Sequence, residues 1–134
     1  MEISAKVRNS SATHEVTVST AGVVRSLDIP AKTEGSGSAV NGGEFLMLAL
    51  ATCYCNDLYR EAKRMNIAID GVEVEASACF EGVGLAANNI QYRATVQSLA
   101  CAFDIERLIS ETDAVAEVHN TLRTGVQVLL NRQN

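Results

Sequence analysis

Apolar and polar residues alternate along the first thirty residues of the chain, a pattern typical of β-strands that bury one face. Ile3, Ala5 and Val7, for example, share one face of such a strand. Pro30 ends the alternation, because proline has no backbone N–H to donate to a sheet. The pattern therefore predicts three strands, over residues 2–9, 13–20 and 22–29.

A long helix is expected next, after a loop rich in glycine and serine over residues 31–43. Asn41 has the side chain of a helix N-cap, and Glu44, three residues later, can reach back to the backbone N–H of the cap. The helix should run to about Asn66. Its first three turns are apolar on every side and its last two carry charges, so we expect the first part to be buried and the second to lie at the surface.

Two further alternating segments follow the helix, one from Gly71 and one after a turn over residues 82–89, and they predict a pair of strands. Residues 104–120 have a helical pattern, and residues 126–130 alternate as in a final strand. The order βββαββαβ keeps strands and helices in separate runs, which predicts an α+β fold whose antiparallel sheet wraps a buried central helix. At this length we expect one domain over residues 1–134.

The composition is that of a globular protein, with 47% apolar and 20% charged residues, and it excludes a disordered chain. The formal net charge is −5, and the aromatic residues are three Tyr and three Phe with no Trp. A negative chain with few aromatic rings is poorly suited to phosphate backbones and to stacking on bases. We therefore expect no nucleic-acid partner.

The N-terminus alternates where a secretory signal would be continuously apolar, so we expect a cytoplasmic protein. The longest apolar run, from Phe45 to Cys55 with only Thr52 interrupting it, falls short of the roughly 20 residues that span a bilayer, and no membrane partner is expected. In a cytoplasmic chain, the four cysteines are expected to be free thiols, so their chemistry would be redox or nucleophilic.

Cofactor and metal motifs are absent from the sequence. The loop around Gly35 and Gly37 lacks the third glycine of a dinucleotide fingerprint and the lysine of a P-loop. Cys53 and Cys55 are separated by one residue instead of two, and the two histidines lie far away in sequence. The acidic segment 104–117 is interpreted as an exposed helical surface. We therefore expect no cofactor and no metal.

The two helix cysteines allow two interpretations, small apolar fillers or a reactive thiol. Residues two apart on a helix point roughly 200° away from each other, so Cys53 and Cys55 are not expected to form a disulfide. Cys53 also lies about three turns from the helix start, beyond the reach of that helix's dipole. A reactive Cys53 would therefore need another cation nearby.

The segment from Gly35-x-Gly37 through Asn41-Gly42-Gly43-Glu44 to Cys53 resembles the central-helix signature of the OsmC/Ohr family, the osmotically inducible protein C and organic hydroperoxide resistance proteins, and more closely its OsmC-like branch. The similarity runs from about Gly35 to the last expected strand. It implies an intertwined homodimer in which sheets wrap two central helices, with active sites where the subunits meet. Peroxidase members use a reactive helix cysteine, a resolving cysteine near the last helix, and an arginine and a glutamate that poise the first thiol.

The resemblance assigns the role of the reactive cysteine to Cys53. The resolving cysteine would fall near residues 116–119, but the chain has no cysteine after Cys101. Resolution would therefore depend on Cys79, on Cys101 or on an external thiol reductant, because a sulfenic acid must condense with a second thiol.

Glu44 matches the glutamate of the OsmC-like branch, whereas the glutamate of the hydroperoxide-resistance branch would fall at Gly43. Glu44 would then be either a catalytic residue or only the partner of the N-cap. Arg8 is the candidate for the arginine, with Arg25 as the alternative. Lowering a thiol pKa by two units from about 8.5 raises the thiolate from about 3% to about 75% at pH 7, so a peroxidatic Cys53 would be expected to have a lowered pKa, which an adjacent arginine could supply.

The predicted function is that of an OsmC-like thiol-dependent redox protein or peroxidase that reduces organic hydroperoxides through Cys53, with Arg8 and Glu44 as its catalytic partners. The alternative is a non-catalytic dimer that binds a small organic molecule in its interfacial cleft. A thioesterase-like sheet around a long helix also fits the element order, but the helix offers no clear acidic catalytic residue.

Overall fold

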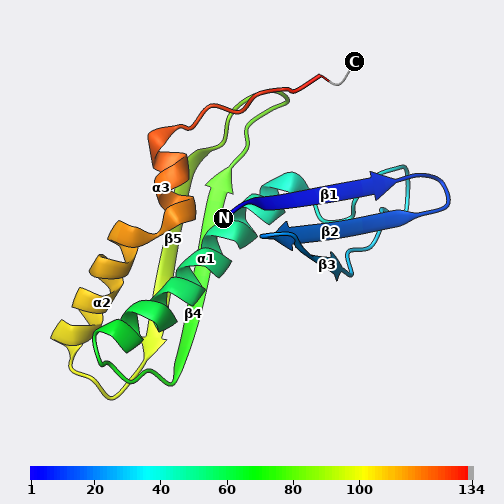
Figure 1. Ribbon diagram of the computed structural model, residues 1–134. Coiled ribbons are helices and arrows are strands. Elements are labelled where there is room, and N and C mark those ends of the chain that lie inside the picture. Colours follow the sequence, from blue (N-terminus) through cyan, green and yellow to red (C-terminus); the bar gives the residue numbers. More distant parts are fainter. Residues whose placement is uncertain (133–134) are drawn as a thin grey trace. The chain divides into compact units, whose positions relative to one another are not determined.

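The structure is a computed structural model that describes residues 1–132 (Figure 1). The predicted domain also includes residues 133–134, which lie outside the described residues. Contacts within the chain divide it into two compact units, Met1–Phe45 and Leu46–Asn134. Within residues 1–132, no helix has the length and hydropathy needed to span a lipid bilayer.

The first unit contains a three-stranded antiparallel sheet in the order β1-β2-β3. Its strands are β1 (Ile3–Asn9), β2 (His14–Thr20) and β3 (Val23–Leu27), which confirms the three predicted strands. The predicted apolar face is formed across the sheet, where Ala5 lies opposite Val18 and Val7 opposite Val16. Among the apolar residues of this unit, all of which the structure describes, Val16 alone is buried.

The loop after β3 folds back on itself, with an isolated bridge between Ala31 and Ser38. At the turn of this loop the backbone N–H of Gly37 donates to Asn9 Oδ1 over 3.2 Å. Gly37 has a φ of +110°, which side chains with a Cβ rarely adopt, so the glycine is required by the shape of the loop. The loop is thereby tied to the first hairpin.

The second unit consists of a long helix, a β-hairpin and two shorter helices. They are α1 (Gly42–Arg64, whose first turn lies in the first unit), β4 (Gly71–Cys79), β5 (Asn88–Gln97), α2 (Ala102–Val115) and α3 (Glu117–Thr124). β4 and β5 pair antiparallel, with Val72 opposite Val96 and Val74 opposite Ala94. Their apolar side chains point to one face and their polar side chains to the other, as the alternation predicts.

The core of the second unit lies between this inward face and the helices. Tyr54, Leu58 and Ala62 of α1 pack with Leu108 of α2 and with partly buried residues of both strands. The buried hydroxyl of Tyr54 donates to the backbone carbonyl of Ile109 over 2.7 Å, which satisfies its polar tip and links α1 to α2. Helices α1 and α2 therefore cover the same face of the hairpin.

The burial of α1 within the described chain agrees with the expected one only in part. The apolar first half remains largely uncovered, and Leu48 is 57% exposed. The second half exposes Arg60, Lys63 and Arg64 as expected, but its other face is buried and includes two charged side chains, Asp57 and Glu61. The prediction missed this buried face because it ranked the two halves by hydropathy, whereas burial depends on which residues the hairpin and α2 contact.

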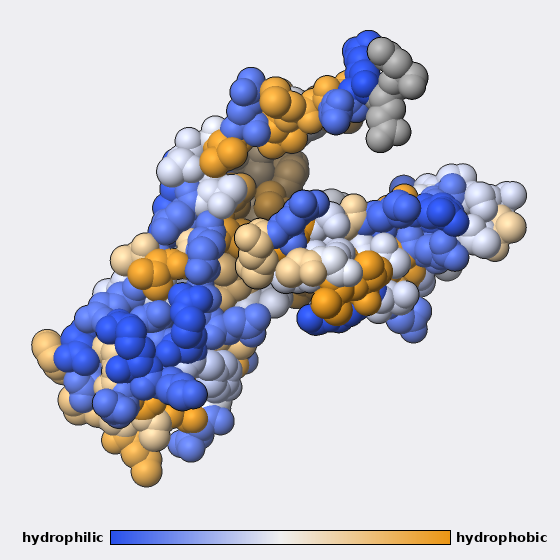
Figure 2. Space-filling model, viewed as in Figure 1, coloured by the Kyte–Doolittle hydropathy of each residue, from blue (hydrophilic) through white to orange (hydrophobic). Residues whose placement is uncertain are grey.

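The C-terminal region also differs from its prediction. The helix expected over residues 104–120 is two helices, separated at Ala116, whose backbone is extended with φ −73° and ψ 105°. The expected final strand is not formed among the described residues, because Val126, Val128 and Leu130 find no partner strand and are exposed, Val128 by 94%. Figure 2 shows both hydrophobic and hydrophilic side chains at the surface of the extended segment that follows α3. The order is thus βββαββαα, and the α+β class is confirmed.

Candidate active site around Cys53

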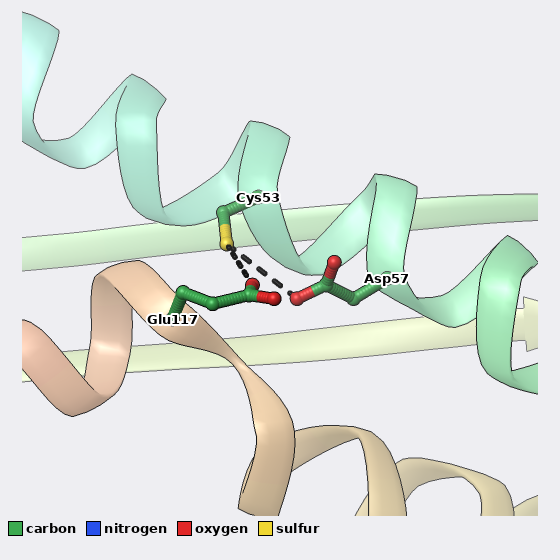
Figure 3. A group of neighbouring side chains, drawn as sticks. All are labelled: Cys53, Asp57 and Glu117. Carbon is green, nitrogen blue, oxygen red and sulfur yellow. Dashed lines mark hydrogen bonds between the residues drawn. The ribbon is translucent and has the colours of Figure 1, made fainter. Parts of the chain in front are cut away.

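Cys53 lies in the middle of α1, with its thiol directed at two carboxylates (Figure 3). Its Sγ donates to Asp57 Oδ2 at 3.5 Å and faces Glu117 Oε2 at 3.9 Å. Asp57 follows Cys53 by one helical turn, a spacing that places two side chains on the same face of a helix. Glu117 comes from the first turn of α3.

Arg60 is the cation of this cluster. Its guanidinium contacts Asp57 Oδ1 at 2.9 Å, Glu61 Oε1 at 3.1 Å and Glu117 Oε1 at 3.5 Å. Asp57 is only 5% exposed, so its negative charge depends on this pairing. Arg60 thus bridges α1 and the start of α3.

The ion pairs continue from the cluster to α2. Arg64 contacts Glu61 Oε2 at 2.5 Å and Glu111 Oε2 at 2.6 Å. The hydrogen bond from Arg64, followed by that from Arg60, holds the pKa of Glu61 below its usual range. The acidic segment 104–117 is therefore more than the solvated surface expected for it, since part of it pairs with α1.

The surroundings of Cys53 raise its pKa instead of lowering it. Burial is the main cause, and the charges of Asp57 and Glu117 act in the same direction, while the backbone N–H of Val118 opposes them. Burial and the neighbouring charge of Glu117 also raise the pKa of Asp57. The pKa of Glu117 is lowered, mainly by its own backbone N–H. The expected lowering of the Cys53 pKa is therefore not produced by the groups around the thiol in this unit.

The start of α3 lies where the resemblance places a resolving residue. Ala116 is its N-cap and has no side chain to cap the first turn, and it is completely buried. The next residues, Glu117 and Val118, provide a carboxylate and a backbone N–H to Cys53. The segment 116–119 thus contacts the thiol, with a carboxylate in place of a second sulfur.

Cys53, Asp57 and Glu117 offer one sulfur and two carboxylate oxygens within 4.8 Å of one another, close enough for a metal ion. The guanidinium of Arg60 already pairs with both carboxylates, and the thiol donates to Asp57. The cluster is thus satisfied by its own hydrogen bonds and charges.

The other candidate residues make local contacts in the first unit. Arg8 on β1 faces Glu15 on β2 at 3.7 Å, and both side chains are exposed. Arg25 is exposed on β3. Glu44 accepts a hydrogen bond from Asn41 Nδ2 at 2.7 Å, while its backbone N–H donates to Asn41 Oδ1 at 2.8 Å. Asn41 is therefore the N-cap as predicted, although Glu44 contacts its side chain instead of its backbone N–H; a catalytic role for Arg8 or Glu44 stays a prediction.

The remaining cysteines lie apart from this cluster. Cys55 lines a shallow hollow with Val74, on a different side of α1 from the carboxylates, as helix geometry predicts. Cys79 and Cys101 are exposed at the end of β4 and before α2. All four cysteines are free thiols, as expected.

A cavity of about 230 Å³ opens between α1, β5 and α3, lined by Leu50, Ile90, Tyr92, His119, Leu122 and Arg123. His119 is 3% exposed, and neither ring nitrogen has a hydrogen-bond partner. Its ring packs against Tyr92, with centroids 4.4 Å apart, and Tyr92 donates to Asp113, which also pairs with Arg123. Burial and the charge of Arg123 lower the pKa of His119, while Asp113 opposes them.

The buried His119 should make stability depend on pH. Because its pKa is lower in the folded than in the unfolded chain, the unfolded chain binds the proton first as the pH falls. The free energy of unfolding should therefore decline as the pH drops below about 6.5, by up to about 1.4 kcal/mol per pH unit. His119→Phe keeps an aromatic ring at this position and removes the titrating imidazole. In this variant the free energy of unfolding in urea should therefore vary less between pH 5 and 7. An unchanged slope in this variant would contradict the assignment.

The sequence model of a known family, described as OsmC-like protein, matches residues 35–131, which is most of the chain. The chain belongs to the OsmC-like family. This confirms the resemblance carried by residues 35–53. None of the curated protein sequences compared with the chain matches it.

Solved structures agree with the family fold. An OsmC-like protein from Mycoplasma pneumoniae is 18% identical with a TM-score of 0.65, covering 91% of this chain and 86% of its own. The organic hydroperoxide resistance protein OsmC from Legionella pneumophila is 18% identical, with a TM-score of 0.61 and coverages of 92% and 90%. The organic hydroperoxide resistance protein OhrB of Bacillus subtilis is 17% identical with a TM-score of 0.56, covering 92% of this chain and 91% of its own. At these identities the likeness shows the OsmC-like fold.

Three residues of this OsmC-like site were missed by sequence reasoning. Asp57 and Arg60 follow Cys53 at helical spacings, so the signal for them was present in the sequence. Glu117 had no such signal, because only the fold brings α3 to α1. It lies within the segment that the resemblance singled out.

Proposed function

We propose that this OsmC-like protein reduces organic hydroperoxides through the thiol of Cys53. The observation that carries the proposal is the cluster of Cys53, Asp57 and Glu117, in which a partly accessible sulfur lies against groups able to accept its proton. Membership of the family supports it, as do fold neighbours whose names describe organic hydroperoxide resistance proteins.

The proposed reaction has three steps. The sulfur of Cys53 attacks one peroxide oxygen, the O–O bond breaks, and the products are a sulfenic acid and an alcohol. Sulfur loses two electrons and the peroxide gains them. An external thiol then condenses with the sulfenic acid and releases water, and a second thiol restores Cys53 with formation of a disulfide between the two reductant molecules.

The raised pKa of Cys53 sets the expected pH dependence. A thiol with a raised pKa is mostly protonated at neutral pH, but its thiolate is a stronger nucleophile. The rate of Cys53 alkylation by iodoacetamide, which needs only the thiolate, should therefore keep rising with pH above about 8.5. In the proposed homodimer an arginine such as Arg8 from the second subunit would add a positive charge beside the thiol. That charge would lower the pKa of Cys53 and so move the rise in rate to lower pH.

The test compares Cys53→Ser with Cys55→Ser, a matched change two residues away that points elsewhere on α1. With cumene hydroperoxide, the unaltered protein and Cys55→Ser should form one sulfenic acid per chain, detected by dimedone trapping and peptide mass spectrometry. Cys53→Ser should form none at that site and lose hydroperoxide consumption. Oxidation of Cys53 no faster than that of Cys79 or Cys101 would refute the peroxidase.

The cavity beside His119 favours a second candidate, a dimer that binds a small organic molecule without reacting with it. Its walls are mainly apolar, and His119 offers an unpartnered nitrogen, as expected of a site that binds an apolar molecule with one polar group. Such a molecule would raise the melting temperature of Cys53→Ser as much as that of the unaltered protein. A peroxidase devoid of other ligands would show no such shift.

A further inference from the structure

Cys53 has two carboxylates beside it, and they differ in their surroundings. Asp57 is buried and accepts the thiol hydrogen bond at 3.5 Å, whereas Glu117 is exposed and 3.9 Å away. Their carboxylate oxygens lie within 4.8 Å of each other. Two carboxylates at such a distance favour keeping one proton between them, and the more buried one is the better proton acceptor.

Arg60 holds the two carboxylates in position but leaves Asp57 able to take a proton. It contacts one oxygen of Asp57, Oδ1 at 2.9 Å, and leaves the other, Oδ2, to the thiol. Burial and the charge of Glu117 raise the pKa of Asp57, while Arg60 opposes them. A carboxyl group whose pKa is moved toward neutrality is suited to general acid–base catalysis.

We propose that Asp57 is the proton carrier of the Cys53 reaction, with Glu117 as the second carboxylate that tunes it. This inference rests on the proposed function. As the sulfur attacks the peroxide, the thiol proton passes to Asp57 Oδ2. As the O–O bond breaks, Asp57 returns that proton to the leaving alkoxide, which departs as an alcohol. The sulfenic acid forms without net uptake or release of protons.

The role of Asp57 separates two reactions of the same thiol. Alkylation by iodoacetamide requires only the thiolate, whereas hydroperoxide reduction also requires a proton for the leaving alkoxide. Removing the charge of Asp57 relieves the repulsion that disfavours the thiolate but also removes the proton donor. The two reactions should therefore respond in opposite directions, which a purely structural role of Asp57 would not produce.

The experiment uses the full chain with Cys55, Cys79 and Cys101 replaced by serine, so that all reactivity reports Cys53. In this background Asp57→Asn should be alkylated several-fold faster at pH 7, with the pH midpoint of alkylation shifted to lower pH. Its reduction of cumene hydroperoxide at the same pH 7, where Cys53 still carries the proton that Asp57 would transfer, should be about 100-fold slower. Asp70→Asn, an exposed aspartate in the same unit, serves as the matched control and should change neither rate.

Glu117→Gln provides an independent variant at an exposed position, so it tests the pair even if Asp57→Asn does not fold. It should also speed alkylation at pH 7 and slow hydroperoxide reduction, the latter less than Asp57→Asn does. Glu106→Gln, another exposed glutamate, is its control. Variants that alter both reactions in the same direction, or neither, would overturn the proton-carrier role. A background protein that is alkylated but consumes no hydroperoxide would instead refute the proposed function.

Discussion

Replacing Leu58 by alanine is expected to lower the free energy of unfolding by about 2–5 kcal/mol. Leu58 is completely buried in the core of the second unit, where it packs with Leu108 and Tyr54. Its truncation removes buried methyl groups and leaves a cavity, because the hairpin and α2 can close around it only in part. Urea unfolding followed by circular dichroism measures the loss.

Leu99→Ala is the matched control for this change. The same atoms are removed from a side chain that is 100% exposed, so the free energy of unfolding should change by less than about 0.5 kcal/mol. Equal losses in the two variants would show that the core of the second unit is not where the structure places it.

Replacing Leu48 by lysine is expected to weaken self-association by at least about 100-fold, as measured by sedimentation at micromolar concentrations. Leu48 lies on the apolar first half of α1, which the described chain leaves uncovered, and we expect a second copy to cover it in the proposed homodimer. A charge buried at that interface without a partner costs several kcal/mol.

Leu99→Lys makes the same change at a fully exposed site and should leave association unchanged. The unaltered protein should remain dimeric on dilution to low micromolar concentration. A folded monomer under these conditions would contradict the proposed dimer, whatever the behaviour of the variants.

The strands of both sheets and the start of α1 could be predicted from sequence because their signals are local. Alternation places side chains on opposite faces of a strand regardless of context, and Asn41 caps the residues next to it. The strand predicted over residues 126–130 shows the limit of such local signals. Its residues alternate as in a strand, but a strand also needs a partner, and the described chain provides none.

The candidate site shows the same division between local and distant signals. Cys53 was identified from a motif, and the neighbour one turn later, Asp57, follows from helix geometry. The pKa of the thiol could not be derived from sequence, because it depends on burial and on Glu117, which arrives from another helix. The groups that this chain places around the thiol raise its pKa, and the lowered pKa of a peroxidatic Cys53 stays a prediction that needs a further cation.

The sheet of the first unit has one further consequence. With Val16 as its single buried apolar side chain among the described residues, this sheet has almost no core of its own to hold its hydrogen bonds closed. Amide hydrogen exchange in β1, β2 and β3 should then be governed by whatever surface covers their apolar face. Protection of these amides would report assembly, whereas protection in β4 and β5 would report the folding of the second unit itself.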